Sequence, residues 1–183
     1  FGGSRVLGNF YTPIVKKCIN VALEADCFIH VGCAAGADAE VINSVGRVAP
    51  SRLRVFAQFS PTGAGSFSGS DVAAVQHAEH SGARVSYLAG GPLSLCLKTR
   101  LIRRSVAALT GCVASVFFLA NPSSRGSLNV AKVAAKRDQL VYAIPCGFDT
   151  VPDSLVGLDG LWEISQFAGF RAFQWFPAAG YLF

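Results

Sequence analysis

Short apolar runs alternate along the chain with longer segments in which apolar residues recur every three or four positions. The runs are rich in β-branched and aromatic residues and are too short for helices, so they predict buried strands. These predicted strands cover residues 27–31, 52–59, 84–89, 112–119 and 140–144. The periodic segments predict helices over residues 12–25, 38–45, 71–80, 94–110 and 127–138.

Strands that alternate with helices at this spacing form βαβ units, which pair into a parallel sheet through right-handed crossovers. We therefore expect an α/β fold with an open, doubly wound, mostly parallel Rossmann-like sheet and helices on both faces. In such sheets ligands bind outside the carboxyl ends of the strands. The glycine-rich turns that share this edge lie at residues 3–5, 32–38, 60–66, 90–91 and 123–127.

The turn of residues 121–127, between a predicted strand and a predicted helix, is small and polar. Its glycine lets another molecule approach the backbone, and its hydroxyl groups can cap the next helix. Unpaired N–H groups at the start of a helix, reinforced by the helix dipole, bind phosphate or carboxylate. The turn by itself is better explained as a simple helix cap, but several such turns on one edge favour a ligand site.

Composition and charge exclude only a few classes of fold and function. The 183 residues suffice for one well-packed core, and at 51% hydrophobic and 15% charged the chain is not disordered. The 16 Lys and Arg residues exceed the 11 Asp and Glu residues, giving a net charge of +5 that is compatible with a polyanionic or phosphorylated partner. No apolar run reaches the roughly 18 residues of a membrane helix, so we expect a soluble, cytoplasmic protein.

The six cysteines are scattered, without a C-x-x-C pair, and most lie in apolar runs where a free thiol acts as a small hydrophobic group. Free thiols fit a reducing cytoplasm. The one suggestive trio is Cys27, His30 and Cys33, but in a strand His30 points to the opposite face from both cysteines. We expect no metal and no cofactor.

The predicted helix of residues 94–110 is basic, with Lys98, Arg100, Arg103 and Arg104. Two of these arginines can share a face and place guanidinium groups over a phosphate, although a solvated basic face explains the pattern equally well. Asp38, at the start of its helix, can cap that helix or hold a ribose hydroxyl. The three histidines have no matched partners, so none is assigned to catalysis.

Four motifs occur in a fixed order. They are Gly3-Ser4-Arg5, Gly32-x-Ala34-x-Gly36-Ala37-Asp38, Arg103-Arg104, and Ser124-Arg125-Gly126-Ser127-Leu128-Asn129-Val130-Ala131. Together they resemble the Rossmann-like SLOG superfamily, which includes the DNA-processing protein A family of natural transformation and the Lonely Guy phosphoribohydrolases. The resemblance covers residues 1–147, so that residues 148–183 form a C-terminal extension.

Lonely Guy enzymes cleave the N-glycosidic bond of a nucleotide, and they carry an arginine-lysine pair and a P-G-G-x-G-T-x-x-E motif. Arg103-Arg104 resembles the basic pair, but the position of the glutamate is Val130, and Ser123-Ser-Arg125 replaces the proline and paired glycines. A cleavage that needs a carboxylate is poorly served by these residues. The resemblance therefore argues against this enzyme, which is kept as an alternative function.

The DNA-processing proteins instead have a G-S-L-x-T-A turn without a glutamate, and residues 126–131 are closer to it. This resemblance implies a surface for single-stranded DNA, whose phosphates are held by backbone N–H groups and arginines. The family's paired arginines are only partly matched, with Arg104 at the second position and Ile102 at the first. Other SLOG members sense nucleotide-derived signals, so a small nucleotide or an ADP-ribose derivative is the close rival.

We therefore expect non-catalytic binding of a nucleotide-type ligand or single-stranded nucleic acid at the carboxyl edge. The expected ligand-binding residues are Gly3, Ser4, Arg5, Gly32, Ala34, Gly36, Asp38, Arg100, Arg103, Arg104, Ser124, Arg125, Gly126 and Ser127.

Residues 161–183 are dense in aromatic side chains, which must be buried somewhere. One option is that they cover an edge of the chain's own sheet that a missing first strand would leave open. The other is contact with a neighbouring subunit, in a dimer or a filament. The second is favoured, because Trp162, Phe170, Phe173, Trp175 and Phe176 resemble interface anchors. A structural self-assembling protein on a degenerate SLOG fold is thus a further alternative.

Overall fold

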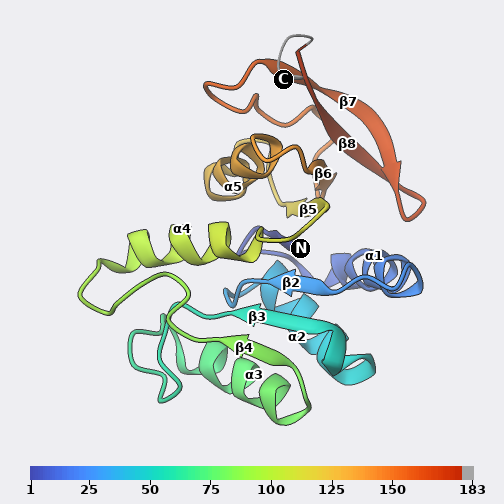
Figure 1. The fold of residues 1–183 in the computed structure, drawn as a ribbon. Coiled ribbons are helices and arrows are strands. Elements are labelled where there is room, and N and C mark those ends of the chain that lie inside the picture. The colour runs from blue at the N-terminus through green and yellow to red at the C-terminus, as the bar shows by residue number, and fades with distance from the viewer. Residues whose placement is uncertain (179–183) are drawn as a thin grey trace.

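The computed structural model describes residues 1–178 and has the expected α/β architecture, with a mostly parallel sheet (Figure 1). The helices are α1 (Thr12–Glu24), α2 (Ala37–Val48), α3 (Gly69–His80), α4 (Leu97–Ala108) and α5 (Arg125–Ala135), with short 3-10 helices η1 (Asn9–Tyr11) and η2 (Pro50–Arg52). The strands are β1 (Gly2–Gly3), β2 (Ile29–Val31), β3 (Leu53–Phe56), β4 (Arg84–Ser86), β5 (Ala114–Leu119), β6 (Leu140–Pro145), β7 (Gly160–Phe167) and β8 (Phe170–Pro177).

The strands form two hydrogen-bonded groups, β2-β3-β4 and β1-β5-β6-β8-β7. All pairs up to β6 are parallel, whereas β8 is antiparallel to both β6 and β7. The two groups meet where the amino nitrogen of Phe1 donates a hydrogen bond of 2.8 Å to the carbonyl oxygen of His30. Figure 1 accordingly shows all the strands in one row, with β4 at one end and the β7-β8 hairpin at the other.

Alternate residues of the central strand β5 face two different cores, as expected for a sheet covered on both sides. Val116 and Phe118 pack in a core with α1, α2, α3 and the inner residues of β2 and β3. Phe117 and Leu119 pack in a second core with α5 and β6. The helices therefore lie on both faces, and the prediction of a doubly wound sheet is confirmed.

Gly2 and Gly3 form the short strand β1 beside Phe117 and Phe118, so this edge of β5 is not left open. From β1 the chain moves outward through β2 and β3 to β4, and then crosses back to β5 on the other side of β1. The direction of winding thus reverses between β1 and β5. This reversal is the topological switch point, where open α/β sheets bind ligands.

The predicted helices and strands are all present, with shifts of a few residues at their ends. One such shift is at α4, which begins at Leu97 rather than near residue 94. The preceding residues form a turn in which the N–H of Leu95 donates to the carbonyl oxygen of Pro92. In α3, the hydroxyl of Ser68 accepts from the N–H of Asp71 and moves the start of the helix to Gly69.

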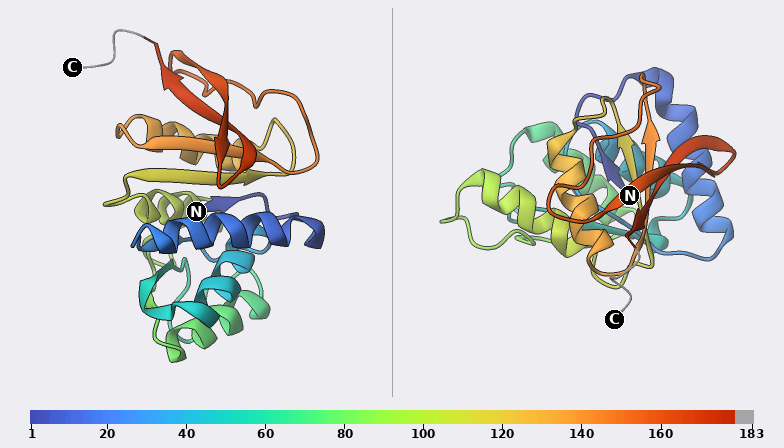
Figure 2. Two further views of the ribbon diagram at one scale, coloured as in Figure 1. Left: turned by 90° about the vertical axis from the view of Figure 1, so that its right-hand side faces the viewer. Right: turned by 90° about the horizontal axis from the view of Figure 1, so that it is seen from above.

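The C-terminal extension adds an antiparallel hairpin to the sheet, because β8 pairs with β6 through Ala143 and Phe173. Phe173 is fully buried, and the rings of Trp162 and Trp175 meet edge to face at 5.3 Å in the core shared with α5. These three aromatic residues anchor the hairpin to its own sheet, so they are not free to anchor a second subunit. Figure 2 (left) shows the hairpin at the end of the sheet farthest from α3.

The last residues of the aromatic segment, 179–183, lie outside the described residues. Phe170 is half-buried and Phe176 is 39% exposed, so they are the two expected anchors that keep accessible surface. No helix in residues 1–178 has both the length and the apolar character required to cross a membrane. Within the same residues, no group of three or more His, Cys, Asp or Glu side chains is arranged to hold a metal ion.

The burial of the hairpin predicts unequal effects of truncating two aromatic residues of β8. Phe173→Ala is expected to lower the free energy of unfolding by about 3–5 kcal/mol, because it empties a core position. Phe176→Ala, on the exposed end of the same strand, is expected to cost about 1 kcal/mol or less. Urea denaturation followed by circular dichroism measures both, and equal losses would contradict the packing of the hairpin.

Candidate functional site

Ser4 joins three elements at the topological switch point. Its hydroxyl accepts a hydrogen bond of 2.8 Å from the N–H of Ala120, and it lies 3.2 Å from the hydroxyl of Ser124. Its carbonyl oxygen accepts from the N–H of Ala37, in the first turn of α2. The turn after β1 is thereby tied to the turn after β5 and to the start of α2. Three of the four motifs meet at this point.

Gly36 allows this close approach, since its backbone has a φ of +77° and packs directly against the chain after β1. A Cβ at this position would lie 2.4 Å from the carbonyl oxygens of Ser4 and Arg5. Only glycine combines that backbone conformation with the absence of a side chain. The second glycine of the G-x-A-x-G-A-D motif is thus explained by backbone packing at the switch point.

The first turn of α5 presents backbone N–H groups to solvent at the same place. Arg125 and Gly126 are exposed, and a Cβ on Gly126 would meet no atom within 4 Å. In the described structure the side chain of Ser124 does not cap the helix, because its hydroxyl donates instead to the carbonyl oxygen of Asn121 at 3.0 Å. The first N–H groups of a helix have no partner within the helix. The uncapped start of α5 can therefore receive an anion.

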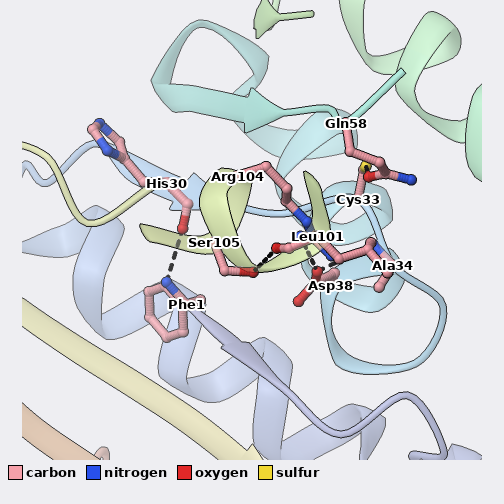
Figure 3. A network of polar contacts seen from close by, with 9 residues as sticks. All are labelled: Phe1, His30, Cys33, Ala34, Asp38, Gln58, Leu101, Arg104 and Ser105. Atoms are coloured by element: carbon pink, nitrogen blue, oxygen red, sulfur yellow. Dashed lines mark hydrogen bonds and ion pairs between the residues drawn. The ribbon is translucent and has the colours of Figure 1, made fainter. Parts of the chain in front are cut away.

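Beneath this surface, Arg104 and Asp38 form a buried ion pair of 2.8 Å, with side chains that are 5% and 8% exposed (Figure 3). The same carboxylate oxygen accepts a hydrogen bond of 3.1 Å from the N–H of Ala34. The guanidinium of Arg104 fills the space that a side chain on Gly32 would need. The pair therefore attaches α4 to the turn that follows β2.

Arg100 makes the equivalent connection one turn earlier on α4. Its Nη1 donates to the carbonyl oxygens of Gln58 at 2.7 Å and Gly65 at 2.9 Å, and its Nε donates to Leu95 at 3.2 Å. The side chain of Gln58 in turn accepts from the thiol of Cys33 at 2.8 Å, and burial raises the pKa of that thiol to about 11. Arg100 thus attaches α4 to the loop that follows β3.

The structure divides the expected site residues into two groups. Residues with accessible surface at the switch point are Ser4, Arg5, Gly36, Ser124, Arg125, Gly126 and Ser127, with Gly3 in β1 beside them. Residues that lie buried beneath the edge are Gly32, Asp38, Arg100 and Arg104, with Ala34 half-buried above Asp38. Arg103 is exposed on α4, and its guanidinium lies near Gly91 in the turn after β4.

Sequence reasoning missed three residues of this edge. Gln58 is buried and accepts hydrogen bonds from both Cys33 and Arg100, although the apolar run of residues 52–59 in which it lies showed no special pattern. Phe67 is 66% exposed in the loop after β3, with the guanidinium of Arg5 5.7 Å from its ring centre. Phe10 is 84% exposed on the connection after β1. A large aromatic residue in a polar loop was the signal that could have identified Phe67.

An open pocket of about 320 Å³ lies farther along the same edge, at the carboxyl end of β6. It is beside the switch point rather than in it. Its lining residues are Ile14, Ile144, Pro145, Gly147, Phe148, Asp149, Phe170 and Arg171.

The chain matches no family model, no curated protein and no solved structure. The function of this site is therefore argued from its own geometry.

The two adjacent arginines of α4 provide a matched test of the buried ion pair. Arg104→Met leaves the carboxylate of Asp38 buried without its partner and is expected to lower the free energy of unfolding by about 3–5 kcal/mol. Arg103→Met changes an exposed side chain and is expected to stay within about 0.5 kcal/mol of the wild type. Chemical denaturation compares the two, and a stable Arg104→Met protein would contradict the structural role of the pair.

Proposed function

We propose that the chain binds an anionic ligand, a nucleotide or a single-stranded nucleic acid, at the switch point without chemical turnover. The proposal follows the resemblance to the DNA-processing protein A family. The observation that carries it is the contact between Ser4 and Ser124, 3.2 Å between their hydroxyl oxygens, next to the uncapped start of α5. This contact places two polar turns and a set of free N–H groups at the point where α/β sheets receive ligands.

The charges around the switch point support an anion. Arg5 and Arg125 are exposed there, one in each of the two turns. The carboxylates of Asp38 and Asp71 are buried, and Glu40 accepts hydrogen bonds from the hydroxyls of Thr12 and Ser44. The accessible charge of the two turns is thus positive, in line with the net charge of +5 for the chain.

Binding without cleavage is supported by the residues of α5. The position of the Lonely Guy glutamate is Val130, which is half-buried and packs against the core shared by α5 and β6. The carboxylate of Asp38 is engaged by Arg104 and by the N–H of Ala34. A phosphoribohydrolase would need a free carboxylate beside the ribose, so this alternative has less support from the site.

Gly126 offers a test that separates binding from folding. Gly126→Glu places a carboxylate in the first turn of α5, where the helix dipole favours it by about 0.3–1 kcal/mol and no atom is in its way. The same charge repels phosphate, so binding of a labelled single-stranded oligonucleotide is expected to weaken by about tenfold or more. Fluorescence anisotropy measures the dissociation constant of each variant.

The matched control is Gly126→Gln, which has nearly the same size without the charge and is expected to bind within a few-fold of the wild type. Wild-type binding is also expected to weaken by about tenfold or more between roughly 50 and 200 mM salt, because phosphate contacts release counterions. Absence of oligonucleotide and nucleotide binding at low salt, or equal binding by the Glu and Gln variants, would contradict the proposed site.

We further propose that a second copy of the chain pairs with the outer strand of the hairpin. Within residues 1–178, β7 is hydrogen-bonded only to β8, so its other edge is open. This strand is eight residues long and exposes Leu161 (56%) and Ile164 (72%), with Glu163 as its one charged residue. A long apolar edge strand of this kind is a site for pairing with another chain. Closed pairing gives a dimer, and open pairing gives a filament.

A lysine on β7 tests this assembly. Ile164→Lys is expected to weaken self-association by about tenfold or more, because a lysine on an edge strand opposes pairing with another strand. Val156→Lys, at an exposed loop position before the strand, is the control and is expected to leave association unchanged. Sedimentation velocity over a range of concentrations measures the association. A monomeric wild type, or equal effects of the two lysines, would contradict pairing through β7.

A further inference from the structure

We infer that the chain carries a docking surface for an acidic amphipathic helix of a partner protein. The surface is the face of β2, β3 and β4 that points away from α2 and α3, and it is called the arginine face below. Its residues are Phe28, His30, Arg54, Phe56, Arg84 and Ser86. The arginine face does not include the switch point, so a partner here does not depend on the proposed anion site.

The alternation of side chains along the strands defines the arginine face. One set of residues in β2 and β3 points into the core that contains α1, α2 and α3, so the residues between them point the other way. The inner residues are Ile29, Val31, Leu53 and Val55. The strand register then aligns His30, Arg54 and Arg84 in one row across the three strands. Two arginines on neighbouring strands therefore lie side by side.

The described residues cover only part of this face. Helix α4 packs against β2 and β3, and the carbonyl oxygen of Ala108 lies 3.1 Å from Nδ1 of His30. The cover ends toward β4, where Arg84 and Ser86 are exposed, and Phe28 is 49% exposed. Figure 1 shows α2 behind β3, on the other side of the sheet. Parallel sheets are normally covered by helices on both faces, so this face has room for one more helix beside α4.

The positive charges of the arginine face are not compensated. Within residues 1–178, the guanidinium groups of Arg54 and Arg84 have no hydrogen bond or ion pair, and the buried Nε of Arg54 has no partner. Arg54 instead lies over the ring of Phe28, 4.6 Å from its centre. Arg103 of α4, exposed near Gly91 in the turn after β4, adds a third cation. Like charges side by side on neighbouring strands destabilise a sheet, whereas carboxylates of a partner would stabilise this row.

A helix with an apolar stripe between rows of carboxylates fits this surface. The stripe would cover Phe28 and Phe56, and the carboxylates would meet the three unpaired arginines. A second copy of the chain fits less well, because two arginine faces repel each other. A nucleic acid would match the charges, but the ring of Phe28 already contacts the guanidinium groups of Arg52 and Arg54, at 5.0 and 4.6 Å, and is less open to a base.

The stability of the free protein tests the repulsion within the row. Arg84→Glu places a carboxylate beside Arg54, so the melting temperature is expected to rise by about 1–4 °C. Arg47→Glu makes the same change of charge at an exposed position of α2 and is expected not to raise it. Thermal unfolding followed by circular dichroism measures both. A melting temperature of Arg84→Glu at or below that of the wild type would contradict the uncompensated charge.

A labelled synthetic helix is the probe for the partner. It carries leucines at i, i+3, i+4 and i+7 with glutamates on both flanks, and its matched control has glutamine in place of each glutamate. The wild type is expected to bind the glutamate peptide about tenfold or more tightly than the glutamine peptide. Arg84→Glu is expected to weaken binding of the glutamate peptide by about tenfold or more, and Arg47→Glu to leave it within a few-fold of the wild type. Fluorescence anisotropy at low salt measures these constants.

The outcomes distinguish the partner helix from other ligands. No binding of the glutamate peptide, equal binding of the two peptides, or equal weakening by Arg84→Glu and Arg47→Glu would overturn the docking surface. Loss of oligonucleotide binding in Arg84→Glu, with binding of the glutamate peptide retained, would assign the face to nucleic acid and would also overturn it. The effect of Gly126→Glu on oligonucleotide binding is separate, so the switch point and the arginine face can fail independently.

Discussion

The carboxyl edge depends on the buried ion pair between Arg104 and Asp38, which joins α4 to the start of α2 and to the turn after β2. Two charges removed from water are costly, and their attraction offsets that cost only with good geometry and further hydrogen bonds. Here the pair distance is 2.8 Å, and the carboxylate gains a second partner in the N–H of Ala34. Gly32 makes the room for the guanidinium. Arg100 attaches α4 to the loop after β3 in the same way. Helix α4 therefore holds both the turn after β2 and the loop after β3.

The buried arginines and the exposed arginines of this edge have different roles. Arg100 and Arg104 are buried and hydrogen-bonded in the interior, so the groups that remain accessible to the proposed ligand are the backbone at the start of α5 and the exposed Arg5 and Arg125. Backbone N–H groups hold phosphates without reading the bases. The proposed site, built from these groups, would therefore hold an anionic ligand by its phosphates rather than by its bases.

The sequence predicted the fold because its local signals agree with one another. Apolar runs, helical periodicity and glycine turns all specify one alternating order, and the motifs identified Ser4 and Ser124 before their contact was known. The burial of Arg104 was beyond sequence reasoning, since a partner 66 positions away decides it. The position of the β7-β8 hairpin in the sheet could not be predicted from the sequence either. Aromatic residues such as Phe173 must be covered, but only the pairing of β8 with β6 shows by which surface.

The most direct test of the central claim is a titration of isotope-labelled protein with a single-stranded oligonucleotide, followed by backbone amide resonances. The account predicts the largest shifts at Ser4, Arg5, Gly126 and Ser127, which have accessible surface at the switch point. The opposite edge of the sheet, at Gly111, is predicted to be unaffected. Shifts concentrated at that opposite edge or on β7, or no shifts at low salt, would contradict a ligand site at the switch point.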